Sequence, residues 1–93
     1  MLVKFVSLEK TTNGQYTLKE IMINHKHIIY IQEEPTFQRK LREGKLPLGL
    51  ISEAQFTSIT VSDTPHNKKV IVVGQANEIE AKIFQKSKRL LRG

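Results

Sequence analysis

The stretch that decides the fold is residues 21–34, IMINHKHIIYIQEE. It is the most concentrated apolar run of the chain, and its β-branched and aromatic side chains fit the pleated surface of a strand. Polar residues 24–27 interrupt the run, which predicts two strands, or one sharply bent strand, around a polar corner. Residues 28–31 are apolar at every position, so we expect cover on both of their faces, from the core and from a helix, loop or second protomer.

The residues before this stretch predict two strands joined by a tight turn. Residues 2–9 form the first strand, and Asn13-Gly14 supplies the positive φ of a hairpin turn at little cost. In residues 15–23 the apolar side chains change from even to odd positions. A two-residue period that slips by one predicts a bulge or sharp bend near residues 19–20. Strands bent in this way are what a small, closed or nearly closed barrel requires.

An insertion follows the third strand. Pro35 ends that strand, and residues 36–43 can form a short helix that Gly44 stops. Residues 46–51 then make an apolar loop instead of a solvated one. We expect the whole insertion, residues 35–56, to fold over the barrel or to reach a neighbouring protomer.

Two more strands and a helix complete the chain. Residues 57–63 alternate, which predicts that Ile59 and Val61 face the core while Ser58, Thr60 and Ser62 face water. Residues 70–73 form an apolar strand that needs cover on both faces. From Ala76 the apolar side chains recur at helical spacing.

The pattern therefore predicts a mainly β fold in a single domain, residues 1–93. It is a small, strongly bent, five-stranded antiparallel sheet or barrel, with a helical-loop insertion at residues 35–56 and a basic C-terminal helix at residues 76–93. A chain of this length buries a small core, and oligomerisation is a common remedy.

Composition narrows the class of protein. The chain has no cysteine, which rules out disulfides and thiolate metal sites. No apolar run approaches the roughly 18 residues that span a membrane, and the N-terminus is too polar and short for a signal peptide. We expect a cytoplasmic protein of phage or bacterial origin that has no membrane partner.

The net charge of +6 is concentrated near the C-terminus. No acidic residue follows Glu80, whereas the cations of this tail are Lys82, Lys86, Lys88, Arg89 and Arg92. Such residues contact nucleic-acid phosphates without sequence preference, but the helix dipole alone also favours cations in a last turn. A second basic group flanks Phe37, and its simplest interpretation is the polar face of a short helix. Its members are Arg39, Lys40, Arg42 and Lys45.

His25 and His27 lie two residues apart, on one side of an extended chain, a spacing that metal sites use. A zinc site needs a third ligand, and the nearest candidates, Asp63 and His66, belong to another predicted loop. We therefore predict no metal site and no cofactor. A surface or turn role is the simplest interpretation of the two histidines.

No catalytic pattern is present in the sequence. Glu33 and Glu34 are adjacent, so in a strand they point to opposite faces, which is a poor geometry for an acid–base pair. The sequence has no glycine loop that cradles phosphate and no motif that aligns Ser with His. We predict that the protein is not an enzyme.

Residues 72–79, VVGQANEI, resemble the second signature of the Sm-like (Lsm) proteins, an apolar strand that a glycine turn closes. The family usually has an arginine where this chain has Val73, and its helix precedes the strands. The resemblance implies a ring of about five to seven protomers joined edge to edge, with RNA bound around the pore. Asn24 would then contact a base edge, and His25 or His27 would stack on a base. Asn13-Gly14, Ile23-Asn24 and residues 28–31 also resemble small flagellar-operon and phage proteins.

We therefore predict a non-enzymatic, ring-forming protein that binds RNA or single-stranded nucleic acid. The alternative is a structural or regulatory homo-oligomer that binds a protein partner. The predicted nucleic-acid contacts are Asn24, His25, Lys26, His27, Gly74, Lys82, Lys86, Lys88, Arg89 and Arg92. The predicted oligomer contacts are Ile28, Tyr30, Leu48, Leu50, Val70 and Val72.

Overall fold

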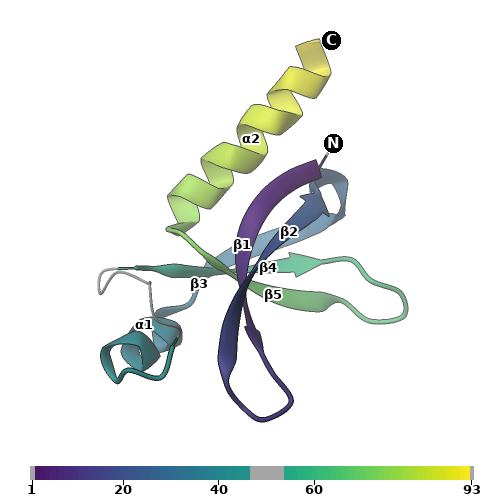
Figure 1. The fold of residues 1–93 in the computed structure, drawn as a ribbon. Helices are drawn as coiled ribbons and strands as arrows, with labels where there is room; N and C mark the ends of the chain where they lie inside the picture. The colour runs from purple at the N-terminus through teal and green to yellow at the C-terminus, as the bar shows by residue number, and fades with distance from the viewer. Residues whose placement is uncertain (1, 47–53, 93) are drawn as a thin grey trace.

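The computed structural model describes residues 2–46 and 54–92, and for residues 86–92 it describes the backbone alone. Its elements in chain order are β1 (Leu2–Lys10), β2 (Tyr16–Asn24), the 3-10 turn η1 (His25–His27), β3 (Ile28–Glu33), α1 (Pro35–Arg42), β4 (Phe56–Val61), β5 (Lys68–Val73) and α2 (Ala76–Arg92). The predicted fold class is confirmed: the chain is mainly β, with five antiparallel strands in one sheet and a C-terminal helix (Figure 1).

The sheet has the strand order β2-β1-β5-β4-β3 and is open between β2 and β3. β1 and β2 form a hairpin paired from Leu2↔Asn24 to Lys10↔Tyr16, and β4 pairs with both β3 and β5. In the described structure the hairpin joins β5 at a single paired position, Ser7↔Val72. The hairpin crosses the other three strands steeply (Figure 1), so the sheet is strongly bent.

Two clusters of buried side chains fill the spaces beside this crossing. The α2-side core consists of Val3, Phe5, Ile59, Val72 and Ile79. The α1-side core consists of Leu8, Leu46, Ala54 and Phe56, with Phe37 and Leu41 of α1 packed against it. Because the two cores lie on opposite faces of the central strands, the expectation that the insertion folds over the sheet is confirmed for its described part.

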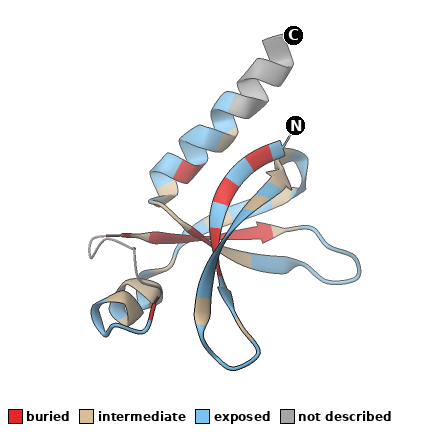
Figure 2. Ribbon diagram, viewed as in Figure 1, coloured by how far each residue is buried: buried red, intermediate tan, exposed pale blue. Residues whose placement is uncertain are grey.

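β1 contributes to both cores. Val3 and Phe5 point into the α2-side core, whereas Leu8 points into the α1-side core. Buried and exposed residues alternate along the first half of β1 (Figure 2), where the odd-numbered residues are buried. The alternation ends at Ser7 and Leu8, which are adjacent and both buried. The strand therefore changes the face that it buries where it crosses β5.

Two predictions about β4 need correction. Ser58 and Thr60 were expected to face water, but only 0% and 7% of their surfaces are exposed. β4 is flanked by β3 and β5 and covered by a core at each face, so the alternating sequence pattern does not distinguish a solvent-exposed face from a buried one. Two buried hydroxyls of β4 donate to backbone carbonyls: Ser58 Oγ to Gln32 O at 3.3 Å, and Thr57 Oγ1 to Gly74 O at 2.9 Å.

Of the predicted bulge or sharp bend near residues 19–20, the bulge is wrong. Pairing of β2 with β1 is regular through Lys19 and Glu20. The register shift occurs between Ile28 and Tyr30 of β3, and the chain turns the corner at η1 instead. Within the described chain, residues 28–31 are not covered on both faces, because half of the surface of Ile29 and of Tyr30 is exposed. Cover by a second protomer stays a prediction.

The predicted glycine turns are confirmed. Gly14 and Gly44 both have positive φ, at 86° and 73°, and the Gly44 amide donates to Leu41 O at 3.1 Å as α1 ends. Among the described residues, no helix is long and apolar enough to cross a membrane.

Candidate nucleic-acid interface

Three lysines gather around Tyr16, where the turn end of the hairpin meets α1. Lys10 is the last residue of β1, Lys40 comes from α1, and Lys45 follows that helix. They border a surface cavity of about 680 Å³, which is lined by Lys10, Gly14, Gln15, Tyr16, Lys40, Lys45 and Leu46. We call Lys10, Tyr16, Phe37, Lys40 and Lys45 the lysine–tyrosine cluster.

Local sequence explains how these residues meet. The turn at Gly14, whose amide donates to Thr11 O at 3.0 Å, sets a register in which Lys10 faces Tyr16. Directly paired residues of an antiparallel ladder project to the same face. Pro35 at the first turn of α1 fixes the start of the helix, and Phe37 and Lys40 then lie three residues apart on one side of it.

Lys40 is held against two aromatic rings. Its Nζ donates to the Tyr16 hydroxyl at 3.0 Å and lies 5.2 Å from the Tyr16 ring centroid and 5.6 Å from that of Phe37. The two rings meet edge to face, with centroids 6.0 Å apart. The hydrogen bond from Lys40 lowers the pKa of Tyr16, against the opposing effect of burial. The rings therefore position the ammonium group by hydrogen bonding and cation–π attraction.

The charge around the cluster is mainly positive. Lys45 pairs with Glu43 at 3.2 Å, whereas Lys10 and Lys40 form no ion pair within the described residues. Lys10 also lies 5.9 Å from the Tyr16 ring. α1 adds Arg39 and Arg42 in its last turn and has no acidic residue in its first. Two positioned ammonium groups with no carboxylate partner can bind an anion.

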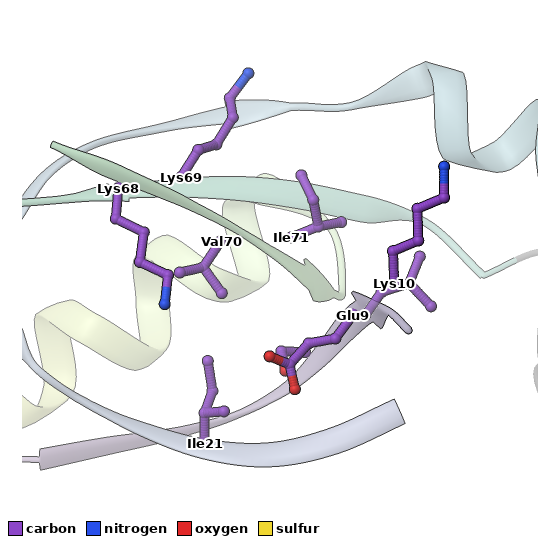
Figure 3. A pocket seen from close by; sticks show the side chains of 9 residues that line it. Glu9, Lys10, Ile21, Lys68, Lys69, Val70 and Ile71 are labelled. Atoms are coloured by element: carbon purple, nitrogen blue, oxygen red, sulfur yellow. The ribbon is translucent and has the colours of Figure 1, made fainter. Parts of the chain in front are cut away.

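A second cavity, of about 280 Å³, lies where β1 and β5 diverge beyond Ser7↔Val72 (Figure 3). Lys68 and Val70 of β5 point into it, and Glu9 and Ile21 approach from the hairpin. Glu9 is paired with Lys19 at 3.7 Å. Its lining also includes Lys10 and Lys69, but Lys69 is paired with Glu34 at 3.1 Å and Lys10 is directed away from the cavity (Figure 3). Lys68 beside Glu9 therefore attracts an anion more weakly than the lysine–tyrosine cluster does.

The predicted contacts at residues 24–27 form the corner between β2 and β3. Asn24 caps η1, where its side chain accepts a hydrogen bond from the Lys26 amide at 3.1 Å. His27 Nδ1 lies 3.3 Å from Ser62 Oγ, and the Ser62 amide donates to His27 O at 2.8 Å. These bonds give the corner a structural role. No group of three or more His, Cys, Asp or Glu in the described chain could hold a metal ion.

Gly74 and Lys82 hold α2 on the sheet. Gly74 has φ of 136°, and a Cβ there would come within 3.0 Å of Ile79 Cδ1. Lys82 Nζ donates to Lys4 O and lies 5.2 Å from the Phe5 ring centroid. The helix contacts η1, so the structure brings residues 24–27 close to α2. The side chains of the other predicted contacts in the tail lie outside the described residues: Lys86, Lys88, Arg89 and Arg92.

The predicted oligomer contacts are divided by the structure. Val72 is fully buried in the α2-side core, so its prediction as a surface contact is wrong. Ile28 and Val70 are half-buried and pack against that core, whereas Tyr30 is half-exposed. Two further predicted contacts, Leu48 and Leu50, lie outside the described residues.

Sequence reasoning missed the lysine–tyrosine cluster as a unit. Its signals were present: the Asn13-Gly14 turn implies that Lys10 and Tyr16 are paired, and Lys40 lies in the basic group beside Phe37. The packing of α1 against the hairpin, which unites the two signals, is a tertiary contact that no local pattern encodes.

Comparison of the chain with models of known families, with curated proteins and with solved structures finds no match.

Proposed function

We propose that this protein is a non-enzymatic nucleic-acid-binding protein whose contact surface is the lysine–tyrosine cluster. The observation that supports this function best is the placement of Lys10 and Lys40 at Tyr16, beside a surface cavity, with no carboxylate partner for either lysine among the described side chains. Lysines that approach phosphates release condensed counterions, and this release supplies most of the sequence-independent affinity for nucleic acid.

RNA or single-stranded DNA is the ligand class that we favour. Aromatic side chains beside a positively charged groove are typical of single-strand binding, and Tyr16 and Phe37 lie in the cluster. Lys40 lies over both rings, so the first contact that we propose is to phosphate, and base stacking follows only if Lys40 moves. The net charge of +6 favours association with any polyanion. The Sm-like ring remains a prediction that this surface does not require.

Fluorescence anisotropy with a short, labelled uridine-rich RNA, titrated over a range of salt concentrations, tests the proposal. Replacing both cations, as Lys10→Gln/Lys40→Gln, should weaken binding at low salt. It should also reduce the slope of log affinity against log salt by about 1.4, because each lost phosphate contact on a single strand contributes about 0.7.

The matched control is Lys19→Gln/Lys69→Gln. It removes the same charge from the sheet, but both of its lysines are paired, with Glu9 and Glu34. The control should change the slope much less. Equal losses in the two double variants would show that only net charge matters and would overturn the cluster as the interface.

A third variant tests the tail instead, by replacing its last four cations with Gln: Lys86, Lys88, Arg89 and Arg92. If only this variant loses RNA, the interface is the terminal helix and the cluster is wrong. A wild-type protein that forms a stable oligomer and ignores RNA at low salt would favour the alternative function, a homo-oligomer that binds a protein partner.

A further inference from the structure

One face of the β1–β2 hairpin carries exposed apolar side chains. Lys4 is paired with Met22, Val6 with Glu20, and Leu8 with Leu18, and side chains of the same parity on each strand share a face. The exposed fractions are 54% for Leu2, 39% for Val6, 37% for Leu18 and 59% for Met22. We call these four residues, with Lys4 and Glu20, the hairpin face.

The hairpin face lies outside both cores of the described structure. The opposite face of the hairpin supplies Val3 and Phe5 to the α2-side core. Further along the same face, Leu8 and Tyr16 belong to the α1-side core, so cover by α1 stops near the turn end. Contiguous apolar surface that a fold leaves uncovered marks an interaction site.

The charges on the hairpin face identify the partner that it fits. Lys4 Nζ lies 3.6 Å from Glu20 Oε2, and both side chains are mostly exposed. The face therefore carries one positive and one negative group, while the whole chain carries +6. Such a balanced face has no net attraction for a polyanion. It is complementary to a copy of itself rotated by a two-fold axis, because each lysine can then meet the other copy's glutamate.

We propose that the hairpin face binds a second copy of this chain in a two-fold symmetric dimer. The apolar side chains of Leu2, Val6, Leu18 and Met22 pack across the axis, and Lys4 of each copy pairs with Glu20 of the other. This interface uses none of the residues of the lysine–tyrosine cluster, so it stands independently of nucleic-acid binding.

Charge exchange tests this geometry directly. Sedimentation velocity should show a dimer of the wild-type chain, and Lys4→Glu alone or Glu20→Lys alone should weaken that dimer by about tenfold or more, because like charges then face each other. An equimolar mixture of the two variants should restore it, because every contact across the axis again joins a lysine to a glutamate. An ion pair that acts only within one chain predicts no restoration.

A second pair of variants tests the apolar part. Met22→Ser should weaken the dimer, whereas Tyr30→Ser should not, although Tyr30 is about equally exposed, at 52%. A wild-type monomer at high concentration overturns the proposal, as does a mixture of the charge variants that stays monomeric. A wild-type monomer that sediments with uncharged phosphatidylcholine vesicles, and loses this binding as Met22→Ser, would also overturn it and would assign the hairpin face to a lipid surface.

Discussion

The β1–β2 hairpin and the central strand β4 differ in how far their side chains are buried. The hairpin has the longest paired register of the sheet, yet exposed apolar side chains lie along one of its faces. β4 is shorter and carries hydroxyl side chains, yet every residue from Phe56 to Thr60 is buried. Position in the sheet, and not the apolar content of the strand, decides which residues lose contact with water.

This difference has a physical cause. β4 has a neighbour at each edge and a core at each face, so even Ser58 is enclosed. β2 is an edge strand, and α1 covers only the turn end of the hairpin. An apolar pattern states how much cover a strand needs, whereas topology determines how much it receives.

The largest expected effect is the difference in free energy of unfolding between truncating a side chain of β4 and truncating one of the hairpin face. Ile59→Ala removes a fully buried side chain of β4 and should lower the free energy of unfolding by about 2–5 kcal/mol. Met22→Ala on the hairpin face should change it by less than about 0.5 kcal/mol. Urea denaturation at low protein concentration, where self-association does not contribute, measures both. A loss at Met22 as large as that at Ile59 would show that the hairpin face is covered within the monomer.

A smaller effect concerns the hydroxyls. Thr57→Val keeps the shape of the side chain but removes the donor to Gly74 O, and it should cost about 1 kcal/mol in the same assay. Thr17→Val on exposed β2 is the control, with an expected change within about 0.5 kcal/mol. If the two variants lowered the free energy of unfolding equally, the buried hydrogen bond would add no stability beyond that of a hydroxyl hydrogen-bonded to water.

The smallest effect lies at the turn end of the hairpin, where α1 meets it. In a Tyr30→Phe background Tyr16 is the only tyrosine. The ultraviolet absorbance of its phenolate should rise at lower pH in the folded protein than in the Lys40→Met variant of that background. Lys40 lowers the pKa of Tyr16 from its ordinary value of 10.0. The resulting stabilisation is fully present above the unfolded pKa and is lost as the pH falls through the folded pKa. Identical titration curves would show that the hydrogen bond is absent in solution.

The sequence was sufficient to predict the strands, the turn at Gly14 and the two helices, because these depend on local patterns. It failed at Ser58 and Thr60, since their burial depends on strands and helices that are distant in the chain. It also failed at residues 19–20, where a change in apolar parity suggested a bulge. In the structure the parity of β2 changes because Tyr16 packs toward the α1-side core, and Ile21 and Ile23 toward the α2-side core.

The candidate site shows the same limit. The basic group beside Phe37 was visible in the sequence, but its union with Lys10 and Tyr16 needed the packing of α1 on the hairpin. In contrast, Gly74 and Lys82 fitted a family signature and a basic tail, and in the structure their contacts hold α2 on the sheet.

The single pair Ser7↔Val72 has a consequence for the order of folding. The hairpin closes over a short loop, whereas joining β1 to β5 at Ser7↔Val72 brings together residues 65 positions apart. Loop-closure entropy makes such distant contacts form late. The joint has one backbone pair, with Val3, Phe5 and Leu8 packed across it in the two cores. We therefore expect that the hairpin and the β3–β4–β5 unit can open as separate cooperative units. Amide hydrogen exchange should then show two levels of protection, with the boundary between β1 and β5.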